Sequence, residues 1–253
     1  MTKLPYIYTD KQLQKMEEFV EQQFGPNYYV AHEIESEYVH TDTLFIRNAK
    51  DEKFFVSCGM GAREMNAPDG FKRCEIVMSA REDFVFASEK GVILAAELAR
   101  ISKFPFRKDT WLGTGHTLDA SEKFKKAFGY DYFAFIKLPL STRLPETDDR
   151  INFLMLVPIY EEEREWCVKN HTLAFLDKLH EKHGGMEYYA DYKRDLFIPD
   201  SSDEEEIADY NVMSALGIDR PTFEKLCEFF EEQEQKGIEV TYDMIGKWVE
   251  ENR

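Results

Sequence analysis

The chain has 253 residues, of which 43% are hydrophobic and 14% aromatic, so it can bury a sizeable core and is not an intrinsically disordered chain. Its formal net charge of −17 at pH 7 argues against binding to nucleic-acid phosphates or to anionic membranes, and it suits a basic partner or simple solubility. Residues 200–253 hold 16 acidic and 5 basic residues, so the C-terminal part supplies most of this charge.

The sequence also limits the cellular location and the state of the thiols. No apolar run approaches the roughly 18 residues that a membrane helix needs, and residues 1–10 lack a signal-peptide core, so we expect a cytoplasmic protein. The cysteines are scattered and form no Cys-x-x-Cys pair, which predicts reduced, mostly buried thiols and neither a disulfide framework nor a zinc ribbon. They are Cys58, Cys74, Cys167 and Cys227.

The chain is organised around residues 54–80, where two apolar, strand-like runs flank a polar connection that contains glycines. These runs predict a long antiparallel hairpin or two neighbouring strands of one sheet. In residues 74–80 apolar side chains mostly alternate with others, a period of two that predicts a strand with one buried face. Residues 28–34 and 43–47 are further strand candidates, and all four segments together predict an antiparallel meander.

Two helices are predicted in the first half of the chain. Thr9 or Asp10 can cap a helix whose apolar residues follow helical spacing until the glycine and proline at 25–26 end it. Residues 91–101 are apolar on nearly every face, which predicts a core helix. This helix should end before Pro105, because the residue that precedes a proline is disfavoured in a helix.

Residues 108–120 form a predicted loop that combines one tryptophan, two glycines and one histidine. Trp111 and His116 have two interpretations. They form either a packed, hydrogen-bonded corner of the fold or a contact with a ligand or partner, since glycines let the backbone approach a ligand closely. A Gly-x-Gly spacing alone is a weak indication of a nucleotide site, and no G-x-G-x-x-G or Walker-type sequence is present.

Residues 130–138 and 151–159 predict two strands joined by an exposed connection, residues 139–150. The second strand is continuously apolar, which predicts burial on both faces. A single helix should follow, from Glu161 to the glycines at 184–185.

Three consecutive acidic residues, Glu161, Glu162 and Glu163, begin this helix. The helix dipole favours carboxylates at this end by about 0.3 to 1 kcal/mol each. The alternative is a carboxylate cluster that binds a metal or a basic partner, although consecutive positions fan around a helix and cannot all converge on one ion.

The same helix carries three histidines without the spacing of a zinc site, so we expect surface residues, no metal and no cofactor. They are His171, His180 and His183. Residues 186–190 and 196–199 then resemble a hairpin that closes the domain.

Beyond residue 199 the pattern changes. Residues 200–206 form a predicted acidic linker, and three short helical patterns follow. These patterns cover residues 207–216, 222–236 and 242–250. So short a segment makes a marginal core of its own, so we expect it to dock on the main domain or on a partner, and its charge does not suit DNA.

Four stretches carry a family resemblance. They are FVSCGMGAREMN with the following CEIVMSARED, ILAAELARI, WLGTGHTL and INFLMLVPIYEEEREW. In this order they resemble a signature strand pair, a central helix, a Gly-His loop and a late strand with an acidic segment of the Suppressor of fused family, bacterial type. The resemblance is strongest over residues 28–198. It implies an α+β domain at residues 1–199, with a mixed, largely antiparallel sheet packed by helices, that binds other proteins and has no catalytic residues.

The favoured function is therefore a non-catalytic protein-binding module. Bacterial members of the family are similar to inferred immunity proteins that bind and neutralise toxin domains, and an acidic surface suits a basic toxin domain. The candidate partner-binding residues are Trp111, His116, Glu161, Glu162 and Glu163. Two alternatives are a ligand-binding or hydrolytic enzyme with a cleft near Cys58 and His116, and a regulatory scaffold that acts through the helical tail.

Overall fold

The computed structural model describes residues 4–68, 70–200, 204–218, 220–238 and 240–252. By its internal contacts the chain divides into two compact units, Met1–Pro199 and Asp200–Arg253. Residues 201–203 of the predicted acidic linker lie outside the described residues. Within the described part of the chain, no helix is both long enough and apolar enough to cross a membrane.

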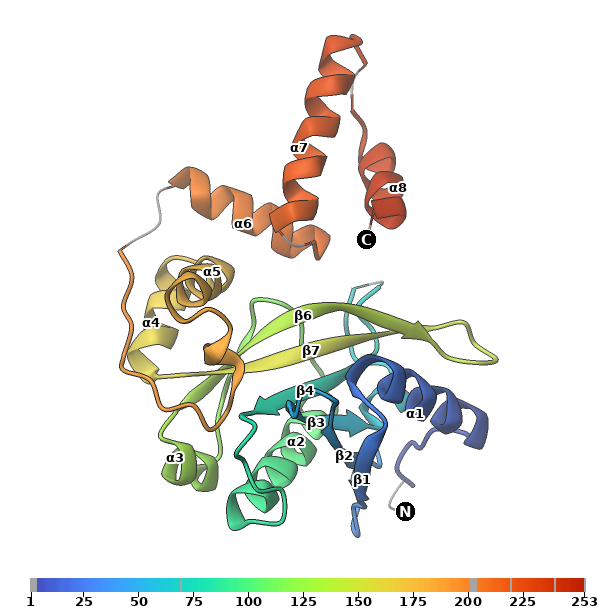
Figure 1. Ribbon diagram of the computed structural model, residues 1–253. Helices are drawn as coiled ribbons and strands as arrows, with labels where there is room; N and C mark the ends of the chain where they lie inside the picture. The colour runs from blue at the N-terminus through green and yellow to red at the C-terminus, as the bar shows by residue number, and fades with distance from the viewer. Residues whose placement is uncertain (1–3, 69, 201–203, 219, 239, 253) are drawn as a thin grey trace. The chain divides into compact units, whose positions relative to one another are not determined.

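The first unit is built on one seven-stranded sheet (Figure 1). Its strands are β1 (Asn27–Ala31), β2 (Asp42–Arg47), β3 (Lys53–Cys58), β4 (Cys74–Ala80), β5 (Thr117–Asp119), β6 (Tyr132–Arg143) and β7 (Arg150–Ile159). The spatial order is β1-β2-β3-β4-β7-β6-β5, and all neighbours pair antiparallel except β4 and β7, which are parallel. The predicted meander and the predicted mixed, largely antiparallel α+β fold are confirmed.

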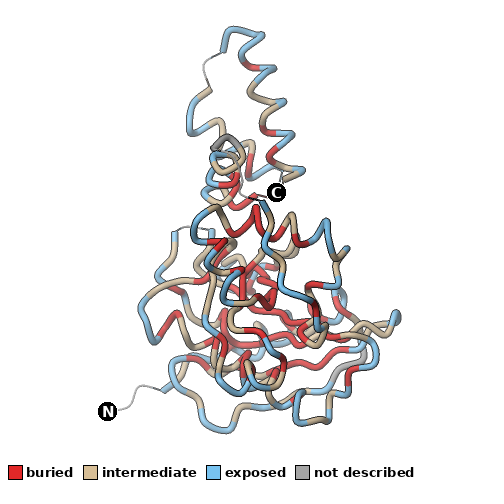
Figure 2. Tube along the Cα trace, turned by 90° about the vertical axis from the view of Figure 1, so that its left-hand side faces the viewer, coloured by how far each residue is buried: buried red, intermediate tan, exposed pale blue. Residues whose placement is uncertain are grey.

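The central strand β4 is buried on both faces, whereas its alternating pattern predicted one buried face. Ile76 belongs to the main hydrophobic core, and Glu75 and Ser79 point to the opposite face. That face is covered because Tyr8 packs over Glu75 and the short 3-10 helix η2 (Met186–Tyr188) packs over Ser79. Figure 2 shows the buried residues gathered in the interior, with exposed residues along the outer loops of the trace.

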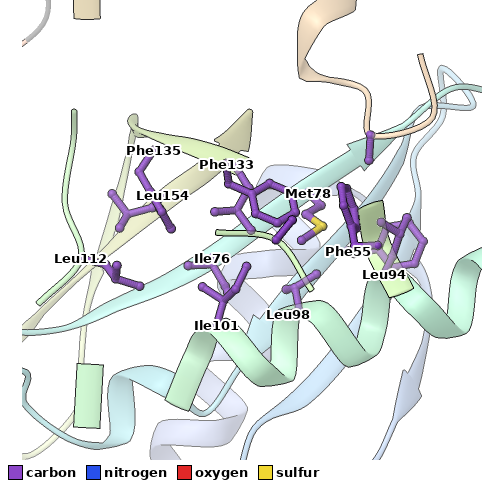
Figure 3. Packing of buried hydrophobic residues seen from close by; sticks show 14 of the residues in the cluster. Phe55, Ile76, Met78, Leu94, Leu98, Ile101, Leu112, Phe133, Phe135 and Leu154 are labelled. Carbon is purple, nitrogen blue, oxygen red and sulfur yellow. The ribbon is translucent and has the colours of Figure 1, made fainter. Parts of the chain in front are cut away.

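The main core lies between the sheet and helix α2 (Glu89–Lys108), as Figure 3 shows. Leu94, Leu98 and Ile101 line one face of α2 and pack toward the strand residue Ile76. Each such side chain contributes roughly 1.5–3 kcal/mol through removal of its apolar surface from water. Val92, on another face, is exposed, so α2 packs into the core on one side and is not buried all round.

Helix α2 continues through Pro105 to Lys108, so the predicted end before the proline is wrong. Proline lacks a backbone N–H and weakens a helix interior. Here the last turn is held because Pro105 and Phe106 are buried and because Asp109, with φ 50°, caps the helix with its N–H on the Pro105 carbonyl.

Helix α1 (Asp10–Phe24) covers part of the opposite face of the sheet (Figure 1). Thr9 forms the predicted N-cap. Phe19 and Phe24 pack on Phe153 of β7, with ring centroids 5.2 and 6.2 Å apart. Because Phe153 alternates with Leu154 of the main core, α1 and α2 lie on opposite faces of the sheet.

The hairpin of β6 and β7 is longer than predicted, because part of the expected exposed connection is strand. β6 runs through Pro139 to Arg143, with an irregular register between Lys137 and Ser141. An irregular stretch accommodates a proline, which cannot donate to the ladder. Strand β7 is buried on both faces over residues 151–159, as predicted.

Two helices follow β7 where one was predicted: α4 (Glu161–Lys169) and α5 (Thr172–His183). The chain turns at Asn170, whose side-chain amide donates to the Trp166 carbonyl at 3.1 Å. His171 then caps α5, because its Nδ1 accepts from the Leu173 N–H at 3.1 Å. These two polar side chains satisfy backbone groups at the break, so a second helix starts there.

The predicted closing hairpin is wrong. Helix η2 occupies residues 186–188, and the chain continues as an irregular segment, residues 189–199, which we call the strap. Tyr189 forms a single parallel bridge with Ser79 of β4. Side-chain contacts, described below, hold the rest of the strap.

Two further parts complete the description. Helix α3 (Glu122–Phe128) extends the main core through Phe124, whose ring lies 4.6 Å from that of Phe133. The second unit contains the three predicted helices, α6 (Glu204–Leu216), α7 (Arg220–Gln235) and α8 (Tyr242–Asn252). Within it, Arg220 pairs with Asp209 at 3.2 Å.

Candidate functional site

Two predicted site residues, Trp111 and His116, meet beside strand β6. Their ring centroids lie 4.4 Å apart, with the rings edge to face. Phe71 adds a third ring, 5.8 Å from that of Trp111. All three residues are partly exposed. We call this group, Phe71, Trp111 and His116, the Trp111–His116 corner.

The backbone around this corner is tied to the sheet. The Gly115 N–H donates to the Phe135 carbonyl at 2.9 Å, and the Phe135 N–H donates to the His116 carbonyl at 3.0 Å. Gly113 lies against the indole, since a Cβ there would stand 2.2 Å from Cζ3 of Trp111. The two glycines of the predicted loop therefore serve the packing of the corner, and Gly115 also adopts a φ of 83°.

The corner presents aromatic surface without charge. Burial lowers the pKa of His116 below its ordinary value, and a backbone hydrogen bond with Trp111 opposes this shift. The imidazole is therefore mainly neutral at pH 7. An aromatic surface with a neutral hydrogen-bonding group is of the kind that protein interfaces use.

The predicted acidic residues lie elsewhere. Helix α4 begins at the end of β7 that pairs with Tyr132, whereas His116 lies further along β6, beside Phe135. Glu161 and Glu162 are exposed in the first turn of α4, where the helix dipole stabilises them. They form a separate carboxylate pair and not a part of the Trp111–His116 corner.

Glu163 is fully buried, so its prediction as a partner-binding residue is corrected. Its carboxylate accepts two hydrogen bonds from the Arg194 guanidinium, one from the Tyr160 N–H at 2.9 Å and one from the Phe197 N–H at 3.0 Å. Arg194 also lies over the rings of Tyr130 and Tyr160, 5.4 and 5.2 Å from their centroids. These contacts hold the strap against α4. The residues that form them follow no periodic pattern in the sequence, so the sequence did not indicate that they meet.

Glu75 is a second buried carboxylate, and it was not among the site residues that the sequence predicted. It accepts hydrogen bonds from the hydroxyls of Tyr8 (2.7 Å) and Ser57, and from the N–H groups of Gly59 (2.9 Å) and Gly61 (3.0 Å). Burial raises the pKa of Glu75, and these bonds oppose the shift. The sequence did contain one indication of this site, because Glu75 lies within an apolar strand and a carboxylate that is buried needs hydrogen-bond partners.

Cys58 does not have the properties of a nucleophile. It is buried at the end of β3, and burial, together with the nearby Glu75 carboxylate, raises the pKa of its thiol well above the ordinary value. The thiol stays protonated at neutral pH, and the thiolate is the reactive form. All four cysteines are free, and three of them are buried, so the predicted burial of most thiols is confirmed.

The two histidines of α5 lie in different surroundings. His180 lies 2.7 Å from the buried carboxylate of Glu187. Burial, with nearby Arg194, lowers the pKa of His183. Among the residues that the structure describes, no group of three or more histidine, cysteine, aspartate or glutamate side chains could hold a metal ion.

A protein-family model described as Suppressor of fused protein (SUFU) matches residues 37–195 of this chain. This stretch includes Glu75 itself, the Trp111–His116 corner and most of the strap. No curated protein matches the chain.

Solved structures with the same fold have low sequence identity to this chain. The crystal structure of Drosophila Suppressor of Fused has a TM-score of 0.56 and 14% identity, over 73% of this chain and 51% of that chain. The Sufu-Fu complex has a TM-score of 0.53 and 13% identity, over 74% of this chain and 90% of that chain. A putative SUFU homolog from Neisseria gonorrhoeae FA 1090 has a TM-score of 0.51 and 12% identity, over 76% of this chain and 98% of that chain. The match therefore spans about half of the Drosophila chain and nearly all of the Neisseria chain.

Proposed function

The chain belongs to the Suppressor of fused family, and we propose that it acts as a non-catalytic protein-binding module. One solved relative is a Sufu-Fu complex, in which that protein is bound to another protein. In this chain, the observation that carries the proposal is the Trp111–His116 corner, a partly exposed aromatic group on a fixed backbone.

The corner has the properties of an interface hot spot. Tryptophan is enriched at hot spots, where a large ring enters a pocket of the partner. The hydrogen bonds of Gly115 and His116 to Phe135 hold the loop before any partner arrives, which lowers the ordering cost of association. Neutral His116 avoids the desolvation of a charge when the corner is covered.

The proposed partner is a basic protein, of the kind that a toxin domain neutralised by an immunity protein would represent. The net charge of −17 supports this proposal, as do the exposed carboxylates of Glu161 and Glu162 and the acidic C-terminal unit. Complementary charge accelerates association more than it raises affinity. The charged groups would thus steer the partner, while the aromatic corner would hold it.

The proposed protein-binding function is tested by co-purification with the full chain from native lysate at moderate salt. Mass spectrometry then identifies the retained proteins. A stoichiometric basic protein should be retained, and Trp111→Ala should weaken its binding by about tenfold or more. Tyr242→Ala, which truncates an exposed aromatic residue of the second unit, is the control. Equal binding by wild type and Trp111→Ala, or no retained protein, would contradict the proposal. If the partner is toxic when expressed alone, co-expression of this chain should restore growth.

The steering role predicts a kinetic effect. The double variant Glu161→Lys/Glu162→Lys should slow association with the captured partner several-fold and reduce its dependence on salt. The matched control, Glu89→Lys/Glu122→Lys, makes the same change of net charge at the exposed first turns of α2 and α3. An association rate that is the same for both variants would mean that only the total charge matters.

A further inference from the structure

A second group of exposed aromatic and aliphatic side chains lies where the N-terminal segment crosses the connection between β1 and β2. Tyr6 is 51% exposed, Tyr38 38%, Ile7 65%, Leu4 90% and Ile34 98%. We call Tyr6, Tyr38 and Arg63 the N-terminal platform, and Leu4, Ile7 and Ile34 are exposed in the same two segments. Exposed apolar side chains on adjoining segments of a surface mark interaction sites more often than isolated ones do.

Backbone hydrogen bonds join the two segments of the platform. The Tyr6 N–H donates to the Tyr38 carbonyl at 3.0 Å, and the His40 N–H donates to the Tyr6 carbonyl at 2.9 Å. Below them, the Tyr8 hydroxyl is fixed on the buried carboxylate of Glu75. The platform is therefore held in place from beneath, although its side chains face solvent.

Tyr38 holds a conformation that its own side chain does not favour. Its φ is 65°, and the Val39 N–H donates across it to the Glu37 carbonyl at 2.7 Å. This is a γ-turn with positive φ, which is rare and strained, and a bulky residue there is an outlier. A glycine would relieve the strain. Strained residues of this kind cluster at ligand contacts and switch regions, and this tyrosine ring is partly exposed.

Arg63 completes the platform. Its guanidinium lies between two rings, 5.2 Å from the centroid of Tyr6 and 5.1 Å from that of Phe106. Within the described part of the chain, no hydrogen bond or ion pair involves this guanidinium. The two rings hold the guanidinium in place, and its N–H donors are available to carbonyl groups of a partner. Tyrosine and arginine are two of the residue types enriched at hot spots.

We infer that the N-terminal platform is a docking surface for a basic segment of a partner protein that also carries apolar side chains. Two exposed carboxylates beside the platform outnumber the single guanidinium of Arg63, so the local charge favours a basic segment. Glu35 and Glu37 flank it and are exposed, and among the described residues neither forms an ion pair, since the ion pairs of this connection use Glu33 and Asp42. The inference rests on the proposed protein-binding function and names a second surface for it.

A phage-displayed library of random peptides, selected on the full chain, tests this surface without the natural partner. The enriched peptides should combine lysine or arginine with apolar residues. Their binding should fall by about tenfold or more in Tyr6→Ala and in Tyr38→Gly. Glu35→Lys/Glu37→Lys should also weaken them, while Tyr242→Ala, an exposed tyrosine of the second unit, should bind them as the wild type does.

Tyr38→Gly separates docking from folding. Glycine accepts a φ of 65° without strain, so this variant should melt at the wild-type temperature or above it and still lose peptide binding. Peptides that bind both tyrosine variants undiminished would overturn the inference, as would an acidic consensus or a failure to enrich any peptide.

The two proposals fail in different ways. Peptides that are lost in Trp111→Ala but not in Tyr6→Ala or Tyr38→Gly would leave the Trp111–His116 corner standing and remove the platform. Peptides that are lost only in the platform variants would support the platform. If the full chain then retains no protein in the co-purification, the proposed function fails even though the platform binds peptides.

Discussion

Two buried glutamates, Glu75 and Glu163, do the same structural task by different chemistry. Each is fully buried, and each binds an irregular segment to the body of the first unit. Glu75 accepts its four hydrogen bonds from uncharged groups, two hydroxyls and two backbone N–H groups. Glu163 accepts two of its four from the guanidinium of Arg194.

This difference sets what each site loses when one partner is removed. Without Arg194, the interior near α4 would hold a carboxylate whose charge nothing balances. Without one of its four neutral donors, Glu75 would keep the other three. Removing one partner of a buried ion pair is therefore more destabilising than removing one neutral donor of a buried carboxylate. The intact pair does not contribute more net stability, because both charges lose their hydration when the protein folds.

The largest effect is expected at the ion pair. Arg194→Ala should lower the free energy of unfolding by about 3–5 kcal/mol, because Glu163 would stay buried without its cationic partner. Urea unfolding at pH 7 measures this loss. The double variant Glu163→Gln/Arg194→Met should recover part of it. Arg143→Ala, which breaks an exposed pair with Asp148, is the control and should change stability little. A loss for Arg194→Ala no larger than that of the control would show that the strap is held by other contacts.

An intermediate effect is expected at Glu75. Glu75→Gln should lower the free energy of unfolding by roughly 1–3 kcal/mol, because an amide cannot accept hydrogen bonds from all four donors. Burial raises the pKa of Glu75, so the folded protein takes up a proton at higher pH than the unfolded chain does. Wild-type stability relative to Glu75→Gln should therefore decrease as pH rises through the folded pKa. Unfolding curves of both proteins at several pH values test this sign, and an opposite trend would contradict it.

The smallest effect on stability is expected at His116, and its pH dependence is opposite in direction to that of Glu75. Burial lowers the pKa of His116, so the unfolded chain takes up a proton near the ordinary histidine value while the folded corner stays neutral. The stability that neutral His116 provides is present above that value and is lost as pH falls through the folded pKa. His116→Gln should therefore destabilise the protein less at acid pH than at pH 7.5, by about 1 kcal/mol or less. Thermal melts at both pH values, with the exposed His32→Gln as control, measure this difference.

Local patterns were sufficient to predict much of the fold. The cap at Thr9, the doubly buried strand at residues 151–159 and the meander through β4 follow from side-chain periodicity and turn chemistry. The misplaced helix end at Pro105 has a tertiary cause, since burial of Phe106 outweighs the local preference. The break at Asn170 depends on two side-chain hydrogen bonds that no periodicity reveals.

The candidate site was harder to predict than the fold. Trp111 and His116 are near neighbours in sequence, so their pairing was within reach. Glu163 looked like a member of an exposed acidic run, and only Arg194, far along the chain, explains its burial. Tyr6 and Tyr38 lie in connections with no regular pattern. Contacts between distant irregular segments produce no periodic pattern in the sequence, so these groups could be identified only from the structure.

The parallel pairing of β4 with β7 affects how the chain is made. Cys74 to Val77 pair with Asn152 to Met155, so the middle of the sheet is joined only after more than half of the chain has been synthesised. Until then β4 is an edge strand with one apolar face, and a second face with Glu75 and Ser79 that the finished fold also buries, and an exposed edge of this kind can recruit other strands. The nascent chain is therefore most prone to aggregate on the ribosome, before β7 emerges, and products truncated before residue 150 should depend on chaperones.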